Sequence, residues 1–396
     1  MNIGLVSTWF ERGAAYVTKS YMNLLKKDHN VFIYARGGEA YGKGDSNWDM
    51  PNVTWGLKLG GDIINYSHFK KWVRSNKLDV VFFNEQRDVT VLHKLKRDFP
   101  QIKLGAYIDY YKEDTVKEFD IYDFLICNTK RHYSVFKNHP QCYYVPWGTD
   151  TDLFKPKESY KKELTFIHSA GMSTRKGTNF VIDAFIEGEI YKQAKLIIHT
   201  QKPIDELFGY NKEKLKKFNI EVIEKTVPAP GLYHLGDVYV YPTTLDGLGL
   251  TMYEALSCGL PIIATNHPPM NEIVNNSNGY LVEVDYLRSR SDGYYWPLSI
   301  VKKESLIDAM NYFIENKDKL NDIKKRNRQE AIKKWEWKDR YKIINEIFVT
   351  TKVIVNNENL DKISISDRTK LRKFIRELKA SNLYKYFYPI LKLLFK

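Results

Sequence analysis

Cysteine is scarce in this chain, and long apolar runs are missing from it. Three cysteines, Cys127, Cys142 and Cys258, occur among 396 residues, and no Cys-x-x-Cys or Cys/His group has the spacing of a zinc site. No eighteen uncharged apolar residues follow one another, which excludes an ordinary membrane-spanning helix. Residues 1–6 lead directly into a strand pattern. They lack the order of basic, apolar and small residues that is typical of a signal peptide. We therefore expect a cytoplasmic protein that needs neither disulfides nor structural zinc.

Positive charge is concentrated at one end of the chain. The formal net charge is +13, and residues 351–396, with eleven Lys or Arg against four Asp or Glu, contribute +7 of it. Residues 352–367 have the composition of a polar linker, and residues 368–380 place apolar side chains at helical spacing between basic ones. Two interpretations fit this tail: an anchor on the anionic inner face of a membrane, or a helix that packs on the first domain. Nucleic-acid binding is disfavoured, because no zinc finger, RNP-like sequence or helix-turn-helix stands out.

Short β-rich runs alternate with stretches of helical period through the first 145 residues. Some runs, such as 80–83, are continuously apolar, which is typical of strands in a parallel sheet that helices cover on both faces. The strands expected here are 3–7, 30–35, 78–84, 102–108, 123–128 and 142–146. This half is therefore predicted to be a doubly wound α/β domain.

The same alternation restarts after a polar stretch at 150–160 that suits a hinge. The strands expected in this second half are 164–169, 196–200, 220–224, 238–241 and 260–265, and helices are expected at 304–316 and 319–334. We predict two Rossmann-like domains that face a central cleft, where open α/β sheets bind ligands. The predicted boundaries are 1–150 and 151–335 for the domains, 336–350 for a closing helix that packs back towards the first domain, and 351–396 for the basic tail.

The segment 241–261, YPTTLDGLGLTMYEALSCGLP, holds a strand, a glycine loop, a helix and a strand in that order. Gly249 lets the backbone approach a ligand, and the helix that opens near Thr251 directs free N–H groups into the same space, so a diphosphate fits there. Asp246 and Glu254 are carboxylates that can each accept two hydrogen bonds from a vicinal diol. We expect Glu254 to bind ribose hydroxyls and Asp246 to bind hexose hydroxyls. A second interpretation is that Thr251-x-x-Glu254 forms a capping box at the helix start.

A second strand, loop and helix start occur at 166–178, FIHSAGMSTRKGT. Arg175 and Lys176 stand where this helix is expected to begin. The helix dipole disfavours cations at that end unless an anion is bound, so these two residues are predicted to be phosphate ligands. The alternative for a Lys-Gly pair is a solvated turn.

These segments resemble the signature of glycosyltransferase family 4, the group 1 retaining glycosyltransferases of GT-B fold. Glu254, Gly249 and Leu250 match its pattern without change, and Asp246 stands where the family has its first Glu. The family also has an Arg five residues before its Lys, where this sequence has Gly171, and we expect Arg175 to supply that charge. The likeness extends to the hinge, VPWGTDTDLF at 145–154, and to GDVYVYPT at 236–243.

The resemblance also implies roles for residues of the first half. FERGAA at 10–15 is the counterpart of the family's glycine-rich loop, so Gly13 is expected to approach the donor phosphate; without that context it equally fits a loop end. Many family members end a first-domain strand with a histidine, where this sequence has Asp109. We expect Asp109 to contact the acceptor or the donor hydroxyls, and the alternative is a helix cap. Asn84-Glu85-Gln86, at another strand end, is a further candidate for acceptor recognition.

The resemblance implies transfer of a sugar, with retention, from a nucleotide-diphosphate donor to a hydroxyl of a glycan or lipid-linked acceptor. Lys176, Asp246 and Asp109 are the predicted catalytic residues, and Gly13, Arg175, Gly249, Leu250, Thr251 and Glu254 are the predicted donor ligands. Fixed positive charge beside the leaving diphosphate makes a metal or another cofactor unnecessary. The alternatives are a nucleotide-sugar epimerase or a phosphorylase of the same fold and, from another class, a basic nucleic-acid-binding protein.

Overall fold

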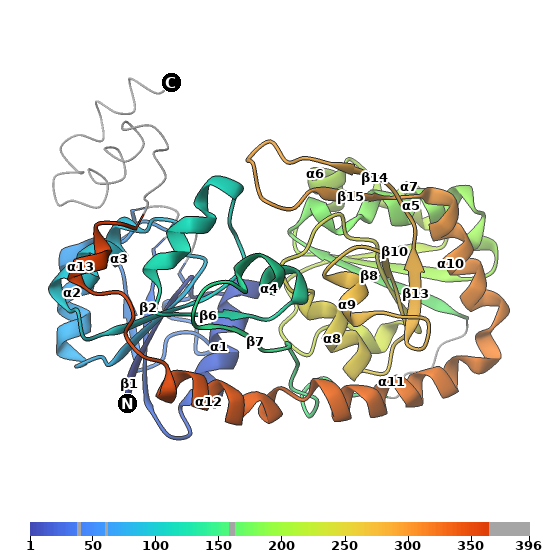
Figure 1. Ribbon diagram of the computed structural model, residues 1–396. Coiled ribbons are helices and arrows are strands. Elements are labelled where there is room, and N and C mark those ends of the chain that lie inside the picture. Colours follow the sequence, from blue (N-terminus) through green and yellow to red (C-terminus); the bar gives the residue numbers. More distant parts are fainter. Residues whose placement is uncertain (38–40, 60–61, 158–162, 364–396) are drawn as a thin grey trace. The chain divides into compact units, whose positions relative to one another are not determined.

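A computed structural model describes residues 1–37, 41–59, 62–157 and 163–363 (Figure 1). The chain forms two compact units, each built around its own parallel sheet. Within the described residues, unit 1 comprises 1–128, 132–145 and 340–363, and unit 2 comprises 129–131 and 146–339.

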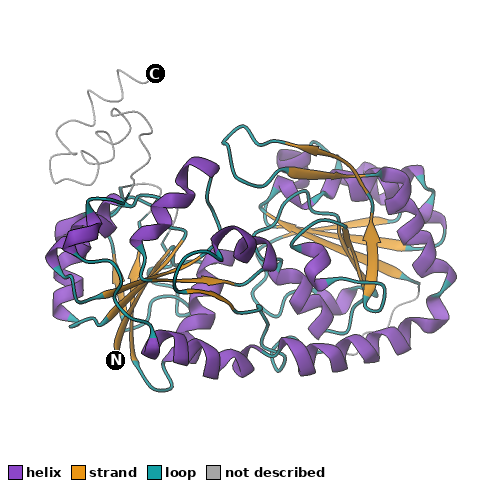
Figure 2. Cartoon of the chain, in the orientation of Figure 1, coloured by secondary structure: helices purple, strands orange, loops and turns teal. Residues whose placement is uncertain are grey.

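Unit 1 contains a seven-stranded parallel sheet in the order β3-β2-β1-β4-β5-β6-β7. The strands are β1 Asn2–Ser7, β2 Asn30–Ala35, β3 Val53–Trp55, β4 Val80–Asn84, β5 Lys103–Tyr107, β6 Phe124–Cys127 and β7 Cys142–Tyr144. Every residue of β4 and β6 is buried, because helices cover both faces of the sheet (Figure 2). The strand order reverses between β1 and β4, and such a reversal marks the edge where doubly wound sheets bind ligands.

Amphipathic helices cover the sheet of unit 1. They are α1 Gly13–Leu25, α2 Tyr66–Ser75, α3 Thr90–Asp98, the 3-10 helix η1 Glu113–Ile121, α4 Lys130–Phe136, whose first residues belong to unit 2, α12 Tyr341–Thr350 and α13 Asn357–Leu360. In α2, the side chain of Asn65 accepts the N–H of His68 at 3.0 Å and caps the helix start. One face of α2 then buries Phe69, Trp72 and Val73.

The segment that follows α12 packs on unit 1, which differs from the predicted linker at 352–367. Val355 and Leu360 are 3% and 1% exposed. The carboxylate of Asp123 accepts the N–H groups of Ile354 and Val355 at 2.8 and 3.0 Å through one oxygen, and the ammonium of Lys96 at 2.5 Å through the other. The linker prediction is therefore wrong for its first part, and the predicted basic helix at 368–380 lies outside the described residues.

Unit 2 repeats the same architecture with six parallel strands in the order β10-β9-β8-β11-β12-β13. They are β8 Thr165–Gly171, β9 Lys195–Thr200, β10 Ile220–Glu224, β11 Val238–Tyr241, β12 Ile262–Thr265 and β13 Gly279–Val282. A separate antiparallel pair joins β14 Val284–Arg288 to β15 Leu298–Val301. The strand order here reverses between β8 and β11.

Helices of unit 2 enclose a core of fully buried aliphatic and aromatic side chains that includes Phe166, Phe185 and Ile198. The α-helices are α5 Thr178–Glu187, α6 Ile204–Phe208, α7 Lys212–Lys216, α8 Leu250–Ser257, α9 Met270–Ile273, α10 Lys303–Glu315 and α11 Leu320–Trp335. Short 3-10 helices are η2 Thr174–Lys176, η3 Ile190–Lys192, η4 Tyr233–Leu235, η5 Lys317–Lys319 and η6 Trp337–Arg340, which continues into unit 1.

The predicted fold class of two Rossmann-like α/β domains is confirmed by these sheets. Four strands, β3, β13, β14 and β15, were not predicted. Most side chains of β3, β13 and β14 are partly buried or exposed, so the apolar signal is weak there. β15 buries three of its four residues, but so short a run gives little periodicity to detect. In the part of the chain that the structure describes, no helix is long and apolar enough to span a membrane.

Candidate functional site

The loop between β11 and α8 lies at the strand-order reversal of unit 2 and carries Asp246. Buried Leu245 and Leu248 anchor it to the core. Gly249 ends it with a φ of +77°, and a Cβ built there would lie 2.3 Å from Cε of Met252. Only glycine therefore suits this position, and it places the first amides of α8 beside the loop.

Both carboxylate oxygens of Asp246 are engaged. Oδ1 accepts the N–H groups of Leu248 and Gly249 at 3.2 and 3.0 Å, and Oδ2 accepts hydrogen bonds from the ammonium of Lys176 and the hydroxyl of Tyr241. Burial by itself raises the pKa of Asp246, but the charge of Lys176 and these hydrogen bonds outweigh it, so the net effect is a pKa well below the usual range. Asp246 is thus a fixed anion that positions the Lys176 ammonium.

Lys176 reaches Asp246 because the loop after β8 is locked to the end of β11. The carbonyl of Arg175 accepts the N–H of Thr244 at 2.9 Å. Gly177 has a φ of +81°, and a Cβ there would lie 2.2 Å from the carbonyl oxygen of Pro242. The Lys176 ammonium also donates to the hydroxyl of Tyr241, and its side chain is 22% exposed.

The sequence predicted that Arg175 and Lys176 stand at the start of the helix after β8. The structure places them before α5 instead. They belong to η2, and α5 begins at Thr178, after Gly177. The side chain of Arg175 is exposed and makes no hydrogen bond or ion pair within the described ranges. Gly171, where the resembled family has its Arg, has a φ of +57°, a conformation that an arginine would adopt only with strain.

Glu254 lies in α8 and bonds to a tyrosine. Its Oε2 accepts the hydroxyl of Tyr233 at 2.5 Å. The capping-box interpretation is wrong, because α8 begins at Leu250, its N-cap is Gly249, and no side chain caps it. Thr251 therefore lies inside the first turn. Burial raises the pKa of Glu254 to about 7, and the hydrogen bond from Tyr233 opposes that rise.

A ladder of three tyrosines connects the two carboxylates, and the sequence analysis missed it. The ring of Tyr239 has its centroid 5.7 Å from that of Tyr233 and 5.5 Å from that of Tyr241. The outer two tyrosines donate to Glu254 and Asp246, respectively. The only sequence signal was the alternation of tyrosines along β11, which is equally typical of any strand.

The raised pKa of Glu254 predicts a pH-dependent stability. The unfolded side chain has a pKa near 4.5, so between pH 4.5 and about 7 the folded state binds more protons, and stability falls as pH rises through that window. Glu254→Gln cannot ionise, so it is expected to gain about 1–3 kcal/mol relative to the native chain on going from pH 5 to pH 8. Urea unfolding at both pH values measures this, with exposed Glu213→Gln as the matched control. An equal pH response in native chain and Glu254→Gln contradicts the prediction.

In unit 1, Gly13 begins α1 beside the end of β4. The amide of Asn84 donates to the carbonyl of Ala14 at 2.8 Å, which ties the two elements together. Glu85 has a φ of +54° and lies 3.7 Å from the guanidinium of Arg12. Gly13 thus starts a helix at the strand-order reversal of its own sheet, the position expected for a phosphate-binding amide.

Asp109 follows β5 and is half-buried. It does not cap the next helix, because η1 begins at Glu113 and its N-cap is Lys112. Gln86 is buried and has a structural role: its amide nitrogen donates to the carbonyls of Asp62 and Asp88, both at 3.0 Å. Among the described residues, no group of three or more His, Cys, Asp or Glu side chains could hold a metal ion.

Unit 2 resembles a known protein family. Residues 149–330 match the family model of glycosyl transferases group 1. This range contains β8 to β15 and the Lys176, Asp246 and Glu254 positions described above. The match lies in unit 2, which is therefore similar to glycosyl transferases of group 1.

Similar proteins agree with that family. A probable sucrose-phosphate synthase of Thermosipho melanesiensis is 31% identical over 153 residues, which are 35% of this chain and 36% of that protein. The UDP-N-acetylglucosamine–peptide N-acetylglucosaminyltransferase GtfA subunit of Streptococcus pneumoniae is 21% identical over 274 residues, 62% of this chain and 54% of that protein. The chain thus spans about a third to a half of the length of these curated relatives.

Solved structures extend the likeness of fold to nearly the whole chain. The pneumococcal O-GlcNAc transferase GtfA, solved with UDP and GlcNAc, has a TM-score of 0.67 at 14% identity, over 88% of this chain and 99% of that chain. The sucrose-phosphate synthase of Thermosynechococcus elongatus has a TM-score of 0.67 at 15% identity, over 88% and 98% of the two chains. At these identities the comparison shows the GT-B fold alone.

Proposed function

We propose that this protein is a retaining, metal-independent glycosyltransferase of family 4. It transfers a sugar from a nucleoside diphosphate to a hydroxyl of a glycan or lipid-linked acceptor. The observation that supports this most directly is the Lys176 ammonium, which Asp246 and Tyr241 hold at the strand-order reversal of unit 2. An ammonium has three donors, so one is left for a phosphate oxygen.

Charge stabilisation is the chemical role of this arrangement. When the anomeric bond breaks, negative charge grows on the diphosphate. Lys176 and the first amides of α8 supply positive charge that is already in place, which is the usual basis of electrostatic catalysis. The family resemblance suggests retention, with the donor phosphate helping to take the proton of the incoming hydroxyl.

Glu254 fits the nucleoside end of such a donor. Its Oε1 has no hydrogen-bond partner within the portion of the chain that the structure describes, while Oε2 is held by Tyr233. A carboxylate oriented in this way accepts hydrogen bonds from the two hydroxyls of a ribose. Because relatives and structural neighbours carry UDP or UDP-N-acetylglucosamine in their names, UDP-sugars are the first donors to test.

The proposal is tested with the full chain, a panel of UDP-sugars and glycan or lipid-linked acceptors. Acceptor-dependent release of UDP that persists in EDTA, with a product that keeps the anomeric configuration of the donor, is the expected result. Loss of activity in EDTA or an inverted product contradicts the metal-independent retaining mechanism. Conversion of the donor sugar without any acceptor supports an epimerase instead.

A further inference from the structure

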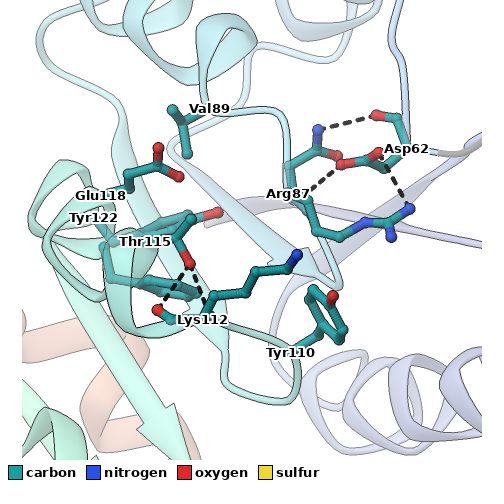
Figure 3. A pocket seen from close by; sticks show the side chains of 10 residues that line it. Asp62, Arg87, Val89, Tyr110, Lys112, Thr115, Glu118 and Tyr122 are labelled. Carbon is teal, nitrogen blue, oxygen red and sulfur yellow. Dashed lines mark hydrogen bonds and ion pairs between the residues drawn. The ribbon is translucent and has the colours of Figure 1, made fainter. Parts of the chain in front are cut away.

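Unit 1 contains a pocket at the carboxyl ends of β4 and β5 that the donor chemistry does not use (Figure 3). Its lining comes from the loops after these strands, from η1 and Tyr122 just after it, and from Asp62 in the segment between β3 and α2. Its volume is about 220 Å³. That is below the roughly 300–1,000 Å³ of sites for drug-sized ligands. The pocket therefore has room for a single small ring rather than an extended chain.

One wall of the pocket is rigid. The carboxylate of Asp62 accepts the N–H groups of Arg87 and Asp88 at 2.6 and 2.7 Å, which fixes the loop after β4. The side chain of Gln86 lines the pocket with its amide oriented by the two carbonyls that accept its NH₂ group. Its Oε1 accepts the guanidinium of Arg36 at 3.0 Å.

Arg36 is a buried cation directly behind this wall. It is 2% exposed, and the hydrogen bonds of its guanidinium go to the carbonyl of Glu85 and to Gln86. Its Nε is buried without a partner, and in the described ranges no carboxylate lies within ion-pair distance of it. A buried charge is costly unless an opposite charge compensates it. Burial lowers the pKa of Arg36, and the charges of Asp62 and Glu85 offset only part of that effect. An anion bound in the neighbouring pocket would add to that compensation.

The lining divides into two chemically different sides. Figure 3 shows the Lys112 side chain extending towards Tyr110, whose ring centroid lies 5.6 Å from the Arg87 guanidinium. The same guanidinium lies 3.5 Å from the carboxylate of Asp62, so the cationic side of the lining already contains one carboxylate. Glu118 lies across from the two cations, and the hydroxyl of Tyr122 points towards the middle. Cations suit an anionic group, whereas a carboxylate and a phenol suit sugar hydroxyls.

We propose that this pocket binds one sugar ring that carries a carboxylate or a phosphate. Arg87 and Lys112 hold the anionic group, and Arg36 reinforces them from behind Gln86. Glu118 and Tyr122 contact the ring hydroxyls, and Tyr110 offers an aromatic face to the ring. This inference rests on the proposed glycosyltransferase function, in which the ring belongs to the acceptor.

The test is direct binding to the full chain in the presence of saturating UDP, which keeps anionic probes out of the donor site. Isothermal titration compares glucuronate and glucose 6-phosphate with neutral glucose. At least one anionic probe is expected to bind about tenfold to a hundredfold more tightly than glucose, the contribution of one charge-assisted contact. The preferred probe tells whether the anionic group is a carboxylate or a phosphate.

Variants assign the binding to this pocket. Arg87→Gln is expected to reduce the affinity for the anionic probe about tenfold or more and to leave glucose binding unchanged. Arg36→Met is expected to reduce the affinity for the anionic probe as well, although Arg36 is not one of the residues that line the pocket. Arg97→Gln removes another exposed cation of unit 1 and serves as the matched control; the side chains of Arg97 and Arg87 are 63% and 52% exposed. Circular dichroism verifies folding.

Two results overturn the inference: equal affinity for glucuronate, glucose 6-phosphate and glucose, or unchanged anion binding in both Arg87→Gln and Arg36→Met. UDP binding separates this failure from failure of the proposed function. A chain that binds UDP but no anionic sugar contradicts the pocket alone. A chain that binds the anionic sugar through Arg87 but neither binds nor releases UDP contradicts the donor-site proposal and leaves the pocket standing.

Discussion

Lys176→Ala is expected to lower kcat for sugar transfer by about 10²–10³-fold, the usual effect of removing one preorganised donor from a developing anion. In the folded protein the Lys176 ammonium is held by Asp246 and Tyr241, so its charge is in place before the diphosphate begins to leave. Because the interaction strengthens as charge develops, kcat is expected to fall more than KM rises. Release of the nucleoside diphosphate at saturating donor measures this change.

Arg175→Ala is a second variant, compared with Lys176→Ala, that tests whether Arg175 also contacts the phosphate. The two residues are adjacent in η2, yet only Lys176 contacts Asp246, while Arg175 is exposed. If Arg175 replaces the family's arginine at the phosphate, its loss also lowers turnover, and if it is a surface residue, turnover stays unchanged. Full activity of a folded Lys176→Ala variant refutes the site assignment. Lys176→Arg shows whether charge alone is sufficient.

Asp123→Ala is expected to destabilise unit 1 by about 3–5 kcal/mol, the range for breaking a buried ion pair from one side. Asp123 is fully buried and Lys96 is 1% exposed, so the variant leaves a buried ammonium without its partner. It also removes the acceptor of the N–H groups of Leu104, Ile354 and Val355. Urea unfolding of the full chain, followed by tryptophan fluorescence, measures the loss.

Asp361→Ala provides the comparison for Asp123→Ala. Asp361 pairs with Arg97 at 2.7 Å, but the two side chains are 76% and 63% exposed. Exposed pairs contribute about 0–1 kcal/mol, so this variant is expected to have little effect. A similar small effect of Asp123→Ala would mean that the carboxylate does not hold the segment after α12 on unit 1. The double variant Lys96→Met, Asp123→Ala is expected to recover part of the loss, because no unpaired charge stays buried.

The shorter acid at position 246 has a structural explanation. The resembled family has a glutamate there. Asp246 accepts two amides of its own loop and, through the other oxygen, the partners that come from β11 and η2. An aspartate side chain is short enough to bond amides two and three residues ahead of itself, as in an Asx-turn. These contacts make Asp246 a positioning residue for Lys176.

The amino-acid sequence by itself determined the two doubly wound sheets and the segments that carry the candidate donor site. Continuous apolar strands such as β4 and β11, separated by helical periods, reveal burial locally, and glycine loops mark where the backbone turns. Edge strands such as β3 were missed because partial burial leaves little apolar pattern. The capping-box prediction at Thr251 was wrong because α8 begins one residue earlier, with Gly249 as its N-cap.

Only the tertiary structure decided which side chains meet. Tyr233 bonds Glu254 across 21 positions, Lys176 bonds Asp246 across 70, and Asp123 binds the N–H of Val355 across 232. The periodicity of apolar residues in the sequence indicates whether a side chain is buried. It does not indicate which strands are neighbours in a sheet or which loops lie close together at its edge. The order of strands in space, which no local pattern encodes, brings these partners within hydrogen-bonding distance.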